Sequence, residues 1–208
     1  MERPQELQDF LDIALPAMQA RAVGAQSRAS LAWIARAAAT PAAPGAAPAR
    51  LPVVEQVLAR ALDRPAQAPD LAALLAALRA LAPRLCWRRR GGHATAGPGF
   101  EGGHANAMLL GPGGIEERRD LWIGLSLLAP GIRYPDHQHA PEETYLVLSP
   151  GQFWQAGGDW FQPGLGGSFY NPPNILHAMQ AGEEPLLALW ALRPEREAAS
   201  RKPRLAAP

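Results

Sequence analysis

The sequence has almost no excess of charge, and this limits the partners that electrostatics alone can attract. Among its 208 residues, 20 Lys and Arg stand against 19 Asp and Glu, so the formal net charge is +1. Nucleic acids and anionic lipid surfaces attract proteins mainly through a large excess of basic groups. We therefore expect no nucleic-acid partner and no membrane partner, and the N-terminal half has no pair of helices with the basic face of a DNA-binding domain.

Long apolar runs are also missing. No stretch of about 18 apolar residues occurs, so we expect no membrane-spanning helix. The first residues, MERPQELQDFLDIALPAMQ, carry acidic groups where a secretion signal would have a basic start and an unbroken apolar run. The expected location is the cytoplasm.

Cysteine and histidine are scarce. The one cysteine, Cys86, has no second thiol with which to form an internal disulfide or a zinc cluster, and we interpret it as a small buried apolar residue. Of the five histidines, His93 and His104 lie in glycine-rich stretches without other chemical groups nearby. We expect both at the surface and assign them no role.

What the sequence does have is ample apolar content, 48%, arranged in two different periods. Apolar residues recur at helical spacing in four segments, at residues 7–18, 31–38, 54–62 and 71–81. Asp70 is the expected N-cap of the last one. The proline-rich stretch TPAAPGAAPAR, residues 40–50, is expected to be a mobile connector. Together these features predict an N-terminal helical region over residues 1–90.

After Arg90 the composition changes to short apolar runs separated by glycine and proline. The expected strands are LWIGLSLLA, TYLVLS, GQFWQA, GSFYN and PLLALWAL. Many short strands joined by tight turns favour an antiparallel barrel or jelly roll. We therefore expect a mainly β protein whose barrel occupies residues 91–208, with the helices packed against it or against a second copy of the chain.

One stretch, YPDHQHAPEETYLVLS at residues 134–149, gathers most of the chemistry. Alternate residues of an extended strand share a face, so His137 and His139 are expected to point the same way, as are Glu143 and Tyr145 beyond a turn. His177, in the later stretch GGSFYNPPNILHAM, supplies a third imidazole. Three imidazoles and one carboxylate suit a divalent first-row metal ion and leave coordination positions open for water or substrate.

These residues resemble the two motifs of the cupin family. The first motif, GxxxxxHxHxxxE, is matched by Gly131, His137, His139 and Glu143, although the closing glycine comes one place late, at Gly151. The second, GxxxxxPxGxxHxxxN, is matched by Gly166, Pro172 and His177. Asn174 replaces its internal glycine, and asparagine is one of the few other residues that tolerate a positive φ. Ala181 replaces its final asparagine. The resemblance covers roughly residues 100–195 and implies a cupin (jelly-roll) β-barrel.

Two tyrosines narrow the resemblance further. With Tyr134 before the first histidine and Tyr145 after the glutamate, the pattern YxxHxHxxxExY is similar to that of the cupin-type dimethylsulfoniopropionate lyases. This resemblance implies one divalent transition metal ion, Fe²⁺, Zn²⁺ or Mn²⁺, held by His137, His139, Glu143 and His177. It also implies a small-molecule substrate, cleaved to dimethyl sulfide and acrylate by β-elimination, with its carboxylate on the metal, Tyr145 as base and Tyr134 assisting.

Elementary chemistry is consistent with these roles. A phenol titrates near pH 10, and a neighbouring cation lowers that value toward neutrality. A sulfonium substrate also needs aromatic faces, for which the candidates are Trp154, Trp160, Tyr170 and Trp190. Gln155, Asn171 and Arg133 are further polar candidates for a carboxylate, although their spacing does not require it.

Three alternatives stay open at this point. The chain is also compatible with a cupin metalloenzyme that acts on another small carboxylate as an isomerase or a different lyase, or with an iron-dependent dioxygenase. It is also compatible with a cupin that binds a ligand without converting it. A homodimer is possible, because cupin-like barrels often pair and the Ala/Leu-rich helices offer apolar surface.

Overall fold

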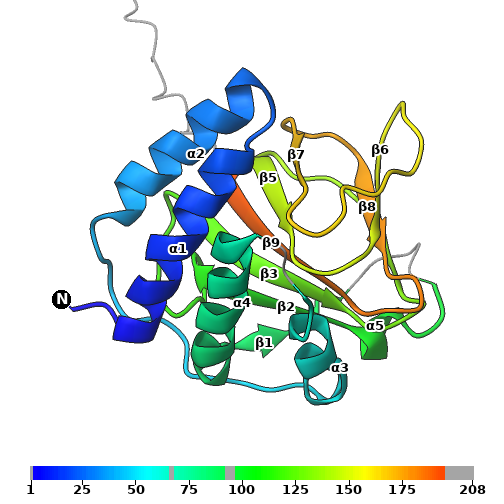
Figure 1. Ribbon diagram of the computed structural model, residues 1–208, viewed down its shortest axis with the longest axis horizontal. Coiled ribbons are helices and arrows are strands. Elements are labelled where there is room, and N and C mark those ends of the chain that lie inside the picture. The colour runs from blue at the N-terminus through cyan, green and yellow to red at the C-terminus, as the bar shows by residue number, and fades with distance from the viewer. Residues whose placement is uncertain (1, 66–67, 92–96, 195–208) are drawn as a thin grey trace, which may run out of the picture.

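The four predicted helices are present in the computed structural model, which describes residues 2–65, 68–91 and 97–194 (Figure 1). They are α1 (Gln5–Arg21), α2 (Gly24–Ala38), α3 (Pro52–Leu62) and α4 (Pro69–Leu81), followed by the short helices η1 (Ala82–Arg84) and α5 (Phe100–Gly103). The described helices include none that is both long and apolar enough to cross a bilayer. His93 lies outside the described residues.

The predicted cap of α4 is wrong. The helix begins at Pro69, with Ala68 as the N-cap residue, and no side chain caps it. Proline fits the first helical position because its φ is already helical and it has no N–H to satisfy. Asp70 instead lies in the first turn and accepts a hydrogen bond from Arg21 Nη2 of α1 at 2.9 Å.

The connector over residues 40–50 lacks regular structure, as predicted, but it is fastened to the barrel. Gly45 N–H donates to the carbonyl of Ile115 at 2.9 Å, and Ala46 N–H donates to the carbonyl of Gly114 at 2.7 Å. A side chain at residue 45 has no room, because its Cβ would lie 2.1 Å from the Gly114 oxygen. These contacts argue against a loosely attached segment.

Two antiparallel sheets form the second half of the molecule. The six-stranded sheet has the order β1-β2-β3-β9-β5-β7, and the three-stranded sheet has the order β4-β8-β6. Their bounds are β1 (Trp87–Arg88), β2 (His104–Leu110), β3 (Trp122–Leu128), β4 (Arg133–His137), β5 (Glu142–Val147), β6 (Gln152–Gln155), β7 (Ser168–Asn171), β8 (His177–Gln180) and β9 (Leu186–Arg193). The five expected strands are β3, β5, β6, β7 and β9. The extended strand expected to carry His137 and His139 corresponds to β4, which ends at His137. The sequence did not predict β1, β2 or β8, and β1 precedes the expected domain boundary at residue 90.

The two faces of the large sheet have different partners. Residues such as Leu125, Leu146 and Leu189 belong to one buried cluster with the apolar side chains of α1 to α4. On Figure 1 the helices accordingly lie along one side of this sheet, and the small sheet lies on the other. The opposite face carries the alternate residues, among them Asn106, Ser126 and Tyr145. The expected fold, a mainly β cupin jelly roll with N-terminal helices packed against it, is confirmed.

Buried polar contacts fasten the helices to the barrel. Ser27 of α2 and Thr144 of β5 share a hydroxyl–hydroxyl hydrogen bond of 3.0 Å. Arg3 Nε donates to the buried Glu116 carboxylate at 2.7 Å, and Arg118 Nη1 donates to it at 3.3 Å. Both arginines also donate to carbonyl groups near the C-terminal end of α2. Carbonyl groups in the last turn of a helix have no partner within the helix, and here the two arginines supply one. The C-terminal end of α2 is therefore held against the barrel.

Candidate metal centre

Three histidines of the motif share the same anchoring contact. The Nδ1 atoms of His137, His139 and His177 lie 2.9, 2.8 and 2.9 Å from the carbonyl oxygens of Pro135, Pro141 and Ile175. A carbonyl oxygen only accepts hydrogen bonds, so each Nδ1 carries the proton. In a neutral ring the lone pair is then on Nε2, which is the tautomer and orientation that a metal-binding histidine needs.

The Nε2 atoms of two of these rings converge on one carboxylate. His139 Nε2 lies 3.3 Å and His177 Nε2 lies 3.4 Å from Oε2 of Glu143. Ligand atoms of these three residues all lie within 4.8 Å of one another. The buried Nε2 of His177 has no hydrogen-bond partner among the described residues. The His177 ring is turned into the barrel beside the first motif, as the metal hypothesis requires.

His137 lies beside this group of three. It ends β4 and pairs directly with His177 of β8, and the centroids of the two rings are 4.1 Å apart. His137 and His139 both line the cavity, as expected, but strand alternation is not the reason, because β4 ends at His137 and residues 138–141 form a loop. Asn174 shapes that loop by donating its backbone N–H to the His139 carbonyl at 2.9 Å. Its φ of 61° is the conformation expected where asparagine replaces the motif's glycine.

Hydrogen bonds fix the carboxylate of Glu143. Asn171 Nδ2 donates to Glu143 Oε2 at 3.0 Å, and Gln155 Nε2 donates to Asn171 Oδ1 at 2.6 Å. Two of the polar candidates named from the sequence therefore orient a protein carboxylate. The third, Arg133, lies over the Trp160 ring and pairs with Asp136.

The electrostatics of the cluster keep Glu143 charged. Burial alone would raise the pKa of Glu143, but the nearby imidazoles of His139 and His177 outweigh burial and lower the pKa well below the usual range. Burial also works against a charged His139, yet the hydrogen bond and charge of Glu143 raise its pKa above 6.5. Burial, and then repulsion from His177, lower the pKa of His137 to about 3, so this ring is neutral at physiological pH.

Both tyrosines of the motif reach the same cavity. Tyr145 follows Glu143 by two residues on β5, and its ring stacks on Phe169 with centroids 4.9 Å apart. Burial first, and the Glu143 charge second, raise its pKa well above 10. The Tyr134 ring lies 4.7 Å from that of His137, and its oxygen accepts a hydrogen bond from Asn106 at 3.3 Å. Burial raises the pKa of Tyr134, although the charge and the hydrogen bond of Arg90, and then the Asn106 bond, oppose that shift.

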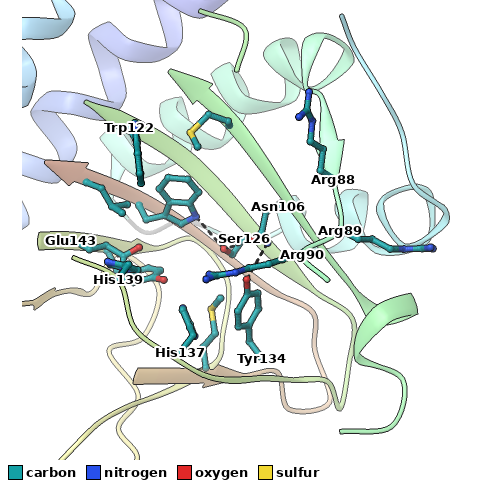
Figure 2. Close-up of a pocket in the computed structure, with 15 residues that line it drawn as sticks. Arg88, Arg89, Arg90, Asn106, Trp122, Ser126, Tyr134, His137, His139 and Glu143 are labelled. Atoms are coloured by element: carbon teal, nitrogen blue, oxygen red, sulfur yellow. Dashed lines mark hydrogen bonds and ion pairs between the residues drawn. The ribbon is translucent and has the colours of Figure 1, made fainter. Parts of the chain in front are cut away.

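The cavity in front of the cluster holds about 360 Å³ and is mostly apolar (Figure 2). Its floor is the inner face of the large sheet, and Figure 2 shows Arg90 reaching across it toward the histidines. The lining residues are Arg88, Arg89, Arg90, Asn106, Met108, Trp122, Ser126, Tyr134, His137, His139, Glu143, Tyr145, Met179, Trp190 and Leu192.

Only one of the four predicted aromatic residues, Trp190, lines this cavity. Tyr170 pairs across the strands with Thr144, whose side chain faces the helices, so Tyr170 lies on that same face of the sheet. The Tyr170 hydroxyl donates to Glu142 at 2.7 Å. Trp154 alternates with the buried Phe153, so it points away from the barrel interior, and its indole N–H donates to the Gly158 carbonyl at 2.8 Å. Trp160 is 36% exposed. For Tyr170 on β7 and Trp154 on β6, strand alternation accounts for the difference, because it places these side chains on faces away from the cavity.

Several lining residues were not predicted because β2 was not. The sequence HANAMLL contains alanine and asparagine, which are poor strand formers, and this conceals the alternation that brings Asn106 and Met108 into the cavity. The surface position expected for His104 is also wrong. This residue is fully buried, stacks on Phe100 with centroids 3.8 Å apart, and accepts the Arg90 backbone N–H at 2.9 Å.

Comparison with known proteins agrees with this geometry. A family model described as dimethylsulfoniopropionate lyase matches residues 25–188. Dimethylsulfoniopropionate lyase DddQ of Ruegeria pomeroyi is 29% identical over 114 residues, which are 54% of this chain and 57% of the relative. The match thus spans little more than half the length of that relative.

Two solved structures share the fold over nearly the whole chain. The crystal structure of DMSP lyase DddQ from Ruegeria pomeroyi DSS-3 has a TM-score of 0.73 at 24% identity and covers 94% of both chains. A chain from the crystal structures of the DMSP lyases RdDddP and RnDddQII has a TM-score of 0.67 at 26% identity, covering 91% of this chain and 92% of that one. Both similarities include the helices as well as the barrel.

Proposed function

Because the chain belongs to the dimethylsulfoniopropionate lyase family, we propose that it is a metal-dependent carbon–sulfur lyase. Its substrate would be dimethylsulfoniopropionate, and its products dimethyl sulfide and acrylate. The observation that carries this proposal is that two tyrosines line one mostly apolar cavity together with His139 and Glu143, whose ligand atoms converge with that of His177. A base and a cation-binding group are what a β-elimination next to a carboxylate requires.

The residues present fit a divalent ion. His139, Glu143 and His177 offer converging ligand atoms, the buried His177 Nε2 has no hydrogen-bond partner in the described chain, and Nδ1 contacts orient each ring. We propose that these three residues and His137 hold Fe²⁺, Zn²⁺ or Mn²⁺, since imidazole and carboxylate ligands suit all three ions. When bound, such an ion would act as a Lewis acid toward the substrate carboxylate and would lower the pKa of a neighbouring phenol.

Tyr145 is the proposed base. Its phenolate would remove a proton from the carbon next to the substrate carboxylate. The electrons of that C–H bond form the carbon–carbon double bond of acrylate, and the C–S bonding pair leaves with neutral dimethyl sulfide. Burial and the Glu143 charge oppose the phenolate, so the reaction depends on positive charge close to Tyr145.

The rest of the cavity suits a zwitterionic substrate. Trp190 and Trp122 line it and offer aromatic faces to a sulfonium group. Arg90 places a guanidinium in the same cavity, where it would attract the carboxylate end. Met108, Met179 and Leu192 give the remaining wall an apolar character that keeps water from the reacting atoms.

A headspace assay tests the proposal directly. Purified protein loaded separately with Fe²⁺, Mn²⁺ and Zn²⁺ should release dimethyl sulfide from dimethylsulfoniopropionate, with an equimolar amount of acrylate in solution. Absence of both products with every metal would contradict the lyase and favour action on another small carboxylate. Homodimer formation and a cytoplasmic location stay predictions.

A further inference from the structure

A series of three hydrogen bonds crosses the floor of the cavity and reaches Tyr134, which also has a hydrogen bond with Arg90. Trp190 Nε1 donates to Ser126 Oγ at 3.1 Å, Ser126 Oγ donates to Asn106 Oδ1 at 2.7 Å, and Asn106 Nδ2 donates to the Tyr134 oxygen at 3.3 Å (Figure 2). The donor residues come from β9, β3 and β2, which are neighbours in the large sheet. Neither of the sequence motifs contains Trp190, Ser126 or Asn106.

This series of hydrogen bonds has a direction, and Trp190 sets it. An indole nitrogen only donates, so Ser126 Oγ accepts there and has its own proton to give to Asn106 Oδ1. With its oxygen occupied by Ser126, the amide of Asn106 turns its NH₂ group toward Tyr134. The Tyr134 oxygen therefore accepts this bond, and its own proton points away from Asn106.

The sheet holds this arrangement in register. Asn106 lies directly opposite Ser126, and Gly124 lies directly opposite Trp190. A Cβ at Gly124 would lie 2.3 Å from the Trp190 ring, so only glycine leaves room for the indole at this position. The first donor of the series is therefore positioned by the backbone of its neighbouring strand.

We propose that Trp190, Ser126 and Asn106 are positioning residues that make Tyr134 an oriented donor, with its O–H directed into the substrate cavity. The inference deepens the proposed lyase function, since the group that Tyr134 would meet is the substrate bound beside the histidines. Tyr134 would then hold the substrate in the geometry that proton removal by Tyr145 requires.

The substitution Asn106→Asp tests the donor-to-acceptor direction of this series of hydrogen bonds. A carboxylate only accepts, so it keeps the Ser126 bond but draws the Tyr134 proton away from the cavity. We expect kcat for dimethyl sulfide release to fall about tenfold, the equivalent of one lost hydrogen bond, with KM changed much less. In a Tyr134→Phe background the same substitution should have almost no effect on kcat, because its target is gone. Equal losses in the two backgrounds would overturn the proposal.

Two controls separate this effect from charge and packing. Gln26→Glu adds the same negative charge at an exposed position of α2 and should leave kcat unchanged. Asn106→Leu removes all polar groups at similar size, so it breaks the series without reversing the Tyr134 proton, and should reduce kcat less than Asn106→Asp. A larger loss in Asn106→Leu would show that packing alone is responsible and would also overturn the proposal.

A readout without turnover keeps this inference distinct from the proposed function. In ¹⁵N-labelled protein, Tyr134→Phe should shift the side-chain amide protons of Asn106, because it removes their acceptor, whereas Ser126→Ala should shift them less. The reverse pattern would mean that the amide points toward Ser126, and the direction inferred here would be wrong. If the expected pattern appears but wild-type protein releases no dimethyl sulfide, the lyase proposal fails while the oriented Tyr134 stands.

Discussion

His177 Nε2 lies 3.4 Å from Glu143 Oε2, although the two residues belong to different sheets. Glu143 is on β5 of the large sheet, and His177 is on β8 of the small one. The candidate metal centre therefore bridges the two sheets. Replacement of either side chain should disturb the metal site more than the backbone pairing within either sheet.

Replacement of His177 by glutamine should remove one proposed ligand while keeping the side chain's approximate size. We expect the affinity for Zn²⁺ or Mn²⁺ to fall by at least about tenfold, measured by competition with a chromophoric chelator. Gln180→Ala is a matched control, since Gln180 is on the same strand and bonds to Gln152 of β6. Equal affinities in wild type and His177→Gln would exclude this residue as a ligand.

Tyr145→Phe distinguishes elimination from oxygen chemistry. The variant should keep its bound metal and lose dimethyl sulfide release by about a hundredfold or more, as expected when a general base is removed. Tyr170→Phe is the same substitution outside the cavity, where the hydroxyl donates to Glu142, and this variant should keep its turnover. Full turnover in Tyr145→Phe would contradict the assignment of this residue as base.

Asn171→Ala should weaken the metal site without removing a ligand. Asn171 holds Glu143 Oε2 at 3.0 Å, so its loss lets the carboxylate rotate away from the imidazoles. Partners of this kind typically contribute about 10- to 100-fold to metal affinity. Chelator competition checks the expected loss, and an unchanged affinity would mean that the strand alone positions Glu143.

Glu116→Gln should destabilise the whole fold. The substitution leaves Arg3 buried without its carboxylate partner, whereas Arg118 keeps its ion pair with Asp120. An uncompensated buried charge such as that of Arg3 costs about 3 kcal/mol or more. Urea unfolding should show a correspondingly lower free energy of unfolding. Glu6→Gln, which breaks an exposed pair with Arg84, should change it little.

Acid should selectively weaken the attachment of α3 to the turn between β8 and β9. Hydrogen bonds from Arg60 and Arg64 lower the pKa of Glu184 from 4.5 to about 2. The unfolded chain therefore takes up this proton first, so the contribution of Glu184 to stability is complete above about pH 4.5 and is lost as pH falls toward 2. The difference in unfolding free energy between wild type and Glu184→Gln should shrink over that range. A constant difference would mean that the two arginines do not stabilise the charged form.

The sequence identifies much of the candidate site because the motif is local. His137, His139, Glu143 and Tyr145 lie within one stretch, and a proline turn marks His177. The helices were also predictable, since Leu7, Phe10, Leu11, Ala14, Leu15 and Met18 follow a helical period and are all buried. The strand β2 was not, because its alanines and asparagine do not favour a strand and only pairing with β3 settles its conformation.

The sequence by itself determined the helical and β halves, the family resemblance and the residue types of the cluster, because period and spacing are local properties. Only the tertiary structure decided which of the four candidate sulfonium-binding aromatic residues lines the cavity, where His104 lies, and how Trp190, Ser126 and Asn106 meet Tyr134. Those relationships depend on the register between strands and on which sheet face the helices cover. Residues far apart in the sequence determine the strand register and the covered face, so no local sequence pattern predicts either of these features.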